Sequence, residues 1–123
     1  MEIKVLHFDR DGLGNRWYEH VATVDVPTYL REANQSEIEY ALEYAYRYTQ
    51  NIGGSWSMER MLDYKGQLYE NPDCNPRVTV VKPLDGENGK KWGHRSSMVG
   101  DRMIGNNHMF EVDSIGFKLV EGE

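Results

Sequence analysis

Two aspartates near the start of the chain come closest to a reactive motif. Asp9 and Asp11 follow the apolar stretch "VLHF" and precede a glycine. In such a pair the first carboxylate can attack phosphorus while the second transfers the proton. A strand-like segment follows this loop at once, however, and no later lysine and acidic pair stands in a suitable arrangement. We therefore interpret residues 9–15, which are rich in Asp, Gly and Asn, as a turn.

The spacing of the histidines and the cysteine does not indicate a metal site. An EF-hand loop with Gly14 at its sixth position would place His20 at the twelfth, where a bidentate glutamate is required. The four histidines and Cys74 lack the short spacings of metal ligands. His7 and His20 could face each other across a hairpin, but structural histidines are the preferred interpretation. We predict no metal and no cofactor, and we interpret Cys74, which has no identifiable activating base, as unreactive.

A cluster of basic, hydroxyl and aromatic side chains lies between residues 92 and 102. Its members are Trp92, Arg95, Ser96, Ser97, Asp101 and Arg102. These groups could supply hydrogen-bond donors, an acceptor and a stacking face to a nucleotide or a modified base. The interpretation that we favour is a local hydrogen-bond clasp, in which residues 95–97 brace the turn at Gly100 and Asp101.

Aromatic residues in the centre of the chain are candidates for binding a partner protein. Tyr40 and Tyr44 are spaced four residues apart in a segment too rich in tyrosine for every ring to face a core. Rigid tyrosine rings are favoured at interfaces, although a ring that packs over a sheet edge explains them as well. Trp56 follows the glycines 53 and 54, and it could equally be exposed for a partner or fill the core from a loop.

The elements that must position these residues can be read from the spacing of apolar residues. Residues 2–8 and 16–27 predict two strands of an antiparallel hairpin. A capping box formed by Ser36 and Glu39 begins an amphipathic helix over residues 36–50. The remaining predicted elements are a short helix at 56–64 and strands at 77–81, 101–104 and 108–120, with a "GNN" turn at 105–107 and a break at 114–116. This order predicts an α+β fold: a small antiparallel sheet, either open or barrel-like, with one main amphipathic helix.

Bulk properties narrow the classes of function. The 123 residues suit a single domain over 1–123. A net charge of −6 argues against general binding to nucleic acid, although it leaves room for a local basic patch. The single cysteine excludes an intrachain disulfide, and no apolar run is long enough to span a membrane. The first residues do not have the pattern of a secretion signal, so we expect a cytoplasmic protein.

The stretch "RSSMVGD", followed by "MFEVDSIGFKLV", provides a resemblance to a known group of proteins. These residues resemble the RSxSVGD-type C-terminal motif of a family of small uncharacterised proteins from tailed bacteriophages, and they are similar to YodL-like domains. The matching residues are Arg95, Ser96, Val99, Gly100, Asp101, Val112, Asp113, Gly116 and Phe117. Met98 departs from the motif, because a second serine is usual there, and this weakens any mechanism based on paired hydroxyls. The opening hairpin and the helix also look like those of the family.

The resemblance implies a biological setting rather than a reaction. It suggests a phage-encoded accessory protein inside a bacterial cell, and it carries over no catalytic residues. Our leading hypothesis is a non-enzymatic protein that binds a host bacterial protein as an inhibitor or modulator, through Tyr40, Tyr44 and Trp56. Binding of a nucleotide or modified base by the 92–102 segment is the alternative.

Overall fold

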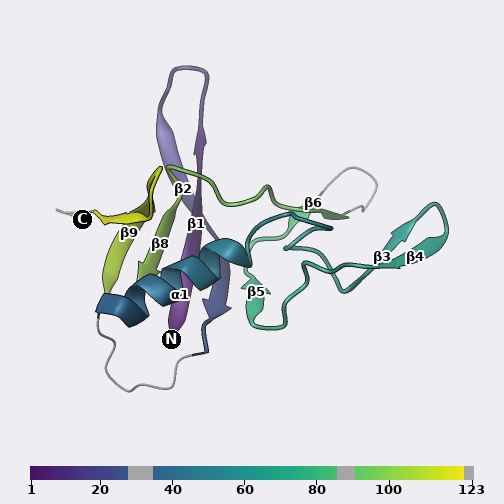
Figure 1. The fold of residues 1–123 in the computed structure, drawn as a ribbon. Helices are drawn as coiled ribbons and strands as arrows, with labels where there is room; N and C mark the ends of the chain where they lie inside the picture. The colour runs from purple at the N-terminus through teal and green to yellow at the C-terminus, as the bar shows by residue number, and fades with distance from the viewer. Residues whose placement is uncertain (28–34, 86–90, 121–123) are drawn as a thin grey trace.

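The computed structural model describes residues 1–27, 35–85 and 91–120. In chain order the elements are β1 (Glu2–Arg10), β2 (Arg16–Asp25), α1 (Gln35–Arg47), β3 (Met61–Tyr64), β4 (Gln67–Glu70), β5 (Val78–Val80), β6 (Leu84–Asp85), β7 (Lys91–Trp92), β8 (Arg102–Gly105), β9 (His108–Val112) and β10 (Phe117–Leu119). Most of the strands form one antiparallel sheet with α1 lying across one of its faces, so the predicted α+β class is confirmed (Figure 1).

The main sheet has the strand order β10-β9-β8-β1-β2-β5. Every neighbouring pair is antiparallel, and the two outer strands of the described sheet do not pair with each other. The sheet is therefore open, and the barrel-like alternative is wrong. Strand β1 lies in its interior, between β2 and β8.

The predicted N-terminal hairpin is confirmed as β1 paired with β2. Its turn forms as the sequence indicates, because Asp11 Oδ1 accepts hydrogen bonds from the backbone N–H groups of Leu13 (2.8 Å) and Asn15 (3.0 Å). The side chain of Asn15, followed by the backbone of Leu13, lowers the pKa of the Asp11 carboxyl. Of the two aspartates in the Asp-x-Asp motif, Asp9 is an exposed residue at the end of β1, opposite Trp17, and Asp11 lies in the exposed turn. The turn predicted over residues 9–15 therefore begins slightly later, after Arg10.

The core lies between the sheet and α1. Alternate residues of β1 and β2 face the helix, which is why Ile3 and Val5 are fully buried opposite Val24 and Ala22. From the helix, Ala41, Leu42 and Ala45 complete the contact. The helix ends at Arg47, slightly before the predicted residue 50. No helix in the described residues is long and apolar enough to cross a membrane.

The central part of the chain departs from expectation. The helix predicted at 56–64 is wrong, because this segment makes a turn and then strand β3. Strands β3 and β4 pair with each other alone, and they form an arm that projects from the body of the protein (Figure 1). The turn of the arm contains Lys65 and Gly66, both with positive φ (52° and 82°), as two-residue hairpin turns require.

The C-terminal strands agree with the sequence pattern. The predicted strand at 101–104 is β8, and the 108–120 segment is divided into β9 and β10 by a turn around Gly116. Between β8 and β9 the "GNN" turn has Asn106 and Asn107 at φ 52° and 62°. Asparagine tolerates this left-handed region better than most residues, which explains its use here.

Candidate functional site

The cluster predicted between residues 92 and 102 contains a clasp centred on Asp101. This carboxylate is fully buried, and it accepts four hydrogen bonds. The backbone N–H groups of Phe8 and Met98 donate to it at 2.9 and 2.8 Å. The two terminal nitrogens of Arg95 donate to its two oxygens, each at 2.7 Å. Arg95 also donates to the carbonyl oxygen of Phe8 at 3.0 Å, so the clasp joins the 95–101 loop to β1.

Ser96 and Ser97 tie the same loop to the end of α1. Ser96 Oγ accepts the N–H of Asn51 at 2.8 Å. Buried Ser97 Oγ lies 2.7 Å from Thr49 Oγ1 and 3.0 Å from His7 Nε2. The three residues that turn geometry alone does not require are therefore all used in a hydrogen-bond clasp, which confirms the favoured interpretation.

The serine, histidine and aspartate of this cluster do not have the geometry of a catalytic triad. In a triad the serine and the carboxylate bind opposite ring nitrogens of the histidine. Here Ser97 Oγ and Asp101 Oδ2 both lie near Nε2 of His7, at 3.0 and 3.8 Å. The protons can be assigned because the Ala45 carbonyl oxygen can only accept, and it lies 2.8 Å from Thr49 Oγ1.

Thr49 therefore donates its single hydroxyl proton to the Ala45 carbonyl oxygen. Thr49 Oγ1 then accepts the hydroxyl proton of Ser97, and Ser97 Oγ in turn accepts the N–H of His7 Nε2. An imidazole protonated at this nitrogen cannot take the Ser97 proton, so the geometry lacks a nucleophile and base pair. Burial lowers the pKa of His7 to about 4, although the Asp101 carboxylate acts in the opposite direction. The ring is therefore neutral near pH 7.

Trp56, a predicted partner-binding residue, is buried. Its exposure is 2%, and its indole N–H donates to the Arg95 carbonyl oxygen at 2.8 Å. The ring stacks on His94 with the centroids 5.7 Å apart. Of the two placements left open by the sequence, the core placement is correct, and the indole is not available to a partner. A surface role for Trp56 is therefore wrong.

The loop that carries Trp56 is held by two side chains from residues 71–73. Asn71, which is buried, accepts the N–H of Ser55 at 3.0 Å and donates to the Ser55 carbonyl at 2.6 Å. Asp73 Oδ2 accepts three consecutive backbone N–H groups of residues 52–54, at 2.7, 3.0 and 2.7 Å. These long-range contacts hold the backbone in loop geometry, which explains why the predicted helix does not begin here.

The other candidate residues are spread over different surfaces. Tyr40 is 50% exposed, while Tyr44 is half-buried and contacts the Tyr48 ring, with the centroids 4.5 Å apart and the ring planes tilted by 45°. Trp92 is 62% exposed. The side chain of Arg102 points to the sheet face opposite Asp101, because successive strand residues alternate, and it pairs with Glu111 at 3.3 Å. The structure thus joins Arg95, Ser97 and Asp101 but does not assemble all six residues into one ligand site.

The proposed pairing of His7 and His20 across the hairpin does not occur. His20 lies opposite Leu6, whereas His7 lies opposite Glu19, so the two rings point to opposite faces. His20 Nε2 lies 2.9 Å from Thr23 Oγ1. Among the described residues no group of three His, Cys, Asp or Glu side chains is placed to hold a metal ion.

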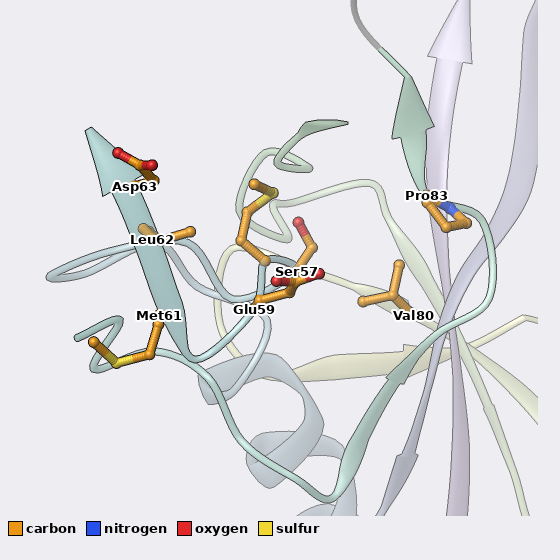
Figure 2. Close-up of a pocket in the computed structure, with 8 residues that line it drawn as sticks. Ser57, Glu59, Met61, Leu62, Asp63, Val80 and Pro83 are labelled. Carbon is orange, nitrogen blue, oxygen red and sulfur yellow. The ribbon is translucent and has the colours of Figure 1, made fainter. Parts of the chain in front are cut away.

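The β3–β4 arm is a surface feature that the sequence interpretation missed. Four of its large apolar side chains are exposed: Met61 (47%), Tyr64 (61%), Leu68 (68%) and Tyr69 (48%). A hollow of about 410 Å³ separates the arm from the edge of the main sheet (Figure 2). It is lined by Ser57, Met58, Glu59, Met61, Leu62, Asp63, Val80 and Pro83. We call it the arm groove. The sequence does contain one signal for the arm, the Lys65-Gly66 turn between two short apolar runs.

No protein-family model, curated protein or solved structure matches the chain at a significant level. The resemblance to the bacteriophage family and to YodL-like domains therefore stays a prediction.

Proposed function

We propose that this protein is a non-enzymatic binding module, and that the β3–β4 arm and the arm groove receive an extended segment of a partner protein. The observation that carries this proposal is the exposure of Met61, Tyr64, Leu68 and Tyr69 on one short arm. Exposed apolar side chains gathered in one place commonly mark an interaction site.

The arm cannot bury these side chains by itself. In the β3–β4 pair, Met61 and Leu68 lie on one face, and Tyr64 and Tyr69 lie on the other. An isolated two-stranded hairpin is only marginally stable in water, since neither face has a second layer. A partner that covers one face would remove apolar area from water, and it would also hold the arm in place.

The lining of the arm groove indicates the chemistry of the partner. Met58, Leu62 and Val80 give it apolar walls. Glu59 and Asp63 are the charged residues of the lining, and no cation is among the described lining residues. Figure 2 shows the side chains of β3 on one side of the hollow, with Val80 and Pro83 on the other. An extended segment that alternates apolar side chains with Lys or Arg fits these walls.

Strand β5 adds a backbone component to the same site. It is an outer strand of the described sheet, where it pairs only with β2, and its Val80 lines the groove. The N–H of Val78 already donates to the Asn75 carbonyl oxygen at 2.9 Å, and an extended segment can use the other outward backbone groups of β5 as an edge for a further strand. This gives binding energy from the backbone, while the groove selects the side chains.

The biological setting rests on the resemblance alone. We propose that the partner is a host bacterial protein and that the chain is a phage-encoded inhibitor or modulator acting in the host cytoplasm. The alternative, a nucleotide site in the 92–102 segment, is less well supported. Asp101 is buried with both oxygens in use, and Ser97 is buried in the clasp.

Selection from a random extended-peptide library tests the proposal directly. We expect selected peptides to alternate large apolar residues with Lys or Arg. The double variant Met61→Ser, Leu68→Ser, which changes two exposed apolar side chains on one face of the arm, one of them in the groove lining, should bind them at least tenfold more weakly. The matched control is Leu13→Ser, Ile115→Ser, which removes two still more exposed apolar side chains (89% and 92%) from other surfaces. Selection of acidic peptides, or equal affinity of the arm variant and the wild type, would overturn the proposal.

A further inference from the structure

The face of the main sheet opposite α1 carries a chemistry different from that of the arm groove. Side chains on this open face come from alternate positions of the strands, as the register defines. Toward the N-terminal end of β1 this face carries Glu2, Lys4 and Asp25, and toward the tip of the hairpin it carries Phe8, Arg10, Arg16 and Tyr18. All of them are exposed or half-buried, and the single helix of the described chain packs on the other face. The open face is therefore accessible in the described structure.

Positive charge gathers on the half of the open face nearest the tip of the β1–β2 hairpin. Among the described strand residues from Leu6 toward the tip, the register places Arg10, Arg16, Arg102 and Lys118 on this face, against one carboxylate, Glu111. The Asp9 side chain lies on the opposite face, and Asp11 lies in the hairpin turn. Four cations and one anion give a local charge of +3, in a chain whose net charge is −6. The chain is acidic overall, but this half of the open face is locally basic.

Two aromatic rings lie among these cations. Phe8 and Tyr18 are directly opposite each other on β1 and β2, with the ring centroids 6.4 Å apart. The guanidinium of Arg16 lies 4.2 Å from the centre of the Phe8 ring, and that of Arg102 lies 4.4 Å from the centre of the Tyr18 ring. Arg102 already donates to Glu111 and to the sulfur of Met109, whereas the planar guanidinium of Arg16, held on the Phe8 ring, has N–H groups that can meet a further ligand.

The two cations nearest the tip are not neutralised by neighbours. Among the described residues, the side chains of Arg10 and Arg16 make no ion pair or hydrogen bond, and the ring of Phe8 is the contact that orients Arg16. Glu111, in contrast, is shared between Arg102 at 3.3 Å and Lys118 at 3.2 Å. Arg10 and Arg16 are therefore the groups best placed to receive anionic groups of a ligand.

From this juxtaposition we propose that the open face binds single-stranded nucleic acid. Arg10 and Arg16 contact phosphates, and an unpaired base stacks on the Arg16–Phe8 pair. Stacking on aromatic rings and guanidinium planes, combined with a cationic track, is the common basis of single-strand binding. Paired bases in a duplex could not reach these rings, because their faces are already stacked on each other.

The open face is poorly suited to a protein partner or to a lipid surface. None of its apolar residues is strongly exposed; Leu6, Ile104 and Met109 are half-buried between the neighbouring side chains. A protein partner or a lipid surface would gain little apolar burial here, in contrast to the arm. A single strand gains its binding energy from charge and stacking, which this face provides.

Fluorescence anisotropy with a labelled 12-residue oligouridylate tests the proposal. The double variant Arg10→Ser, Arg16→Ser should bind at least tenfold more weakly than the wild type. The slope of log affinity against log salt should also fall by about 1.4, since each lost phosphate contact contributes about 0.7. The control Arg47→Ser, Arg60→Ser makes the same charge change on α1 and next to the arm, and it should leave both quantities unchanged. Thermal unfolding of each variant checks that the fold is retained.

Three results would overturn the inference. The first is no binding by the wild type at 50 mM salt. The second is an equal loss in the test and control variants, which would indicate a response to total charge. The third is equal affinity for a duplex of the same length or for phosphatidylserine vesicles, which would indicate a general response to polyanions. Because the Met61→Ser, Leu68→Ser variant leaves the open face intact, it should bind the oligonucleotide normally whatever the result for the arm proposal.

Discussion

Replacing Asp101 with asparagine should destabilise the protein far more than a surface substitution of the same kind. The carboxylate is fully buried and accepts four hydrogen bonds, two from Arg95 and one each from the backbone N–H groups of Phe8 and Met98. The asparagine oxygen can keep the two bonds made at Oδ1. Its amide NH₂ group, at the Oδ2 position, would face two donors, the N–H of Met98 and a nitrogen of Arg95.

The magnitude follows from the groups left without an acceptor. A buried N–H that loses its acceptor costs about 1–3 kcal/mol. The Arg95 side chain is 38% exposed and can turn toward water, so its loss is closer to that of a surface ion pair, about 0–1 kcal/mol. We expect Asp101→Asn to lower the free energy of unfolding by about 1–4 kcal/mol. For a domain of this size that corresponds to a fall in Tm of roughly 4–16 °C.

Arg95→Ala should cost at least as much, because it leaves the buried carboxylate with backbone donors alone; removing one member of a buried pair costs about 3–5 kcal/mol. Urea unfolding followed by circular dichroism measures both variants, and the double variant gives the coupling free energy. The control is Asp9→Asn, whose exposed carboxylate accepts only the N–H of Arg10. An Asp101→Asn protein within about 0.5 kcal/mol of the wild type, or a coupling free energy of zero, would refute the assignment of the clasp as a stabilising element.

Three further predictions concern single side chains. Because burial lowers the pKa of His7 from 6.5 to about 4, the unfolded chain binds a proton that the folded chain does not. The neutral His7 ring contributes fully to the free energy of unfolding above pH 6.5, and about 3 kcal/mol of that free energy is lost as the pH falls to 4. In urea unfolding, His7→Gln should remove this pH dependence of stability. Trp56→Ala should cost about 3–5 kcal/mol, whereas Trp92→Ala should leave Tm nearly unchanged. Gly100→Ala should cost about 1–3 kcal/mol, since φ is +97° and the new Cβ would lie 3.0 Å from Phe8 Cε1; Gly12→Ala, whose Cβ meets nothing within 4 Å, is its control in thermal unfolding.

The sequence correctly predicted the elements that depend on interactions between residues close together in the chain. The turn at Asp11 and the Asn106–Asn107 turn follow from residues that bind their own backbone or tolerate positive φ. The helix follows from its capping box and its apolar spacing, and the N-terminal hairpin follows from alternation. For the turns and the helix the deciding interactions lie within a few residues of one another, and for the hairpin they lie within two strands joined by one short turn.

The failures lie where distant residues decide. Nothing in the 56–64 segment shows that the Asn71 side chain will hold Ser55 and that residues 67–70 will pair with it as β4. The burial of Trp56 depends in part on its contact with His94, which lies thirty-eight residues later in the chain. The basic open face was equally hidden, because its cations come from strands at both ends of the sequence and meet only when β1 joins β8.

The internal position of β1 has a consequence for how the chain is made. This first strand is completed by β8, whose residues 102–104 pair with residues 4–6. At a synthesis rate of about 5–20 residues per second, a ribosome needs roughly 5–20 s to add the intervening segment. Throughout that time the nascent hairpin presents Ile3 and Val5 without their final cover, so it is open to chaperones and to aggregation. Any truncation before residue 101 removes both the neighbouring strand and the clasp, and we expect such fragments to be degraded rather than to fold.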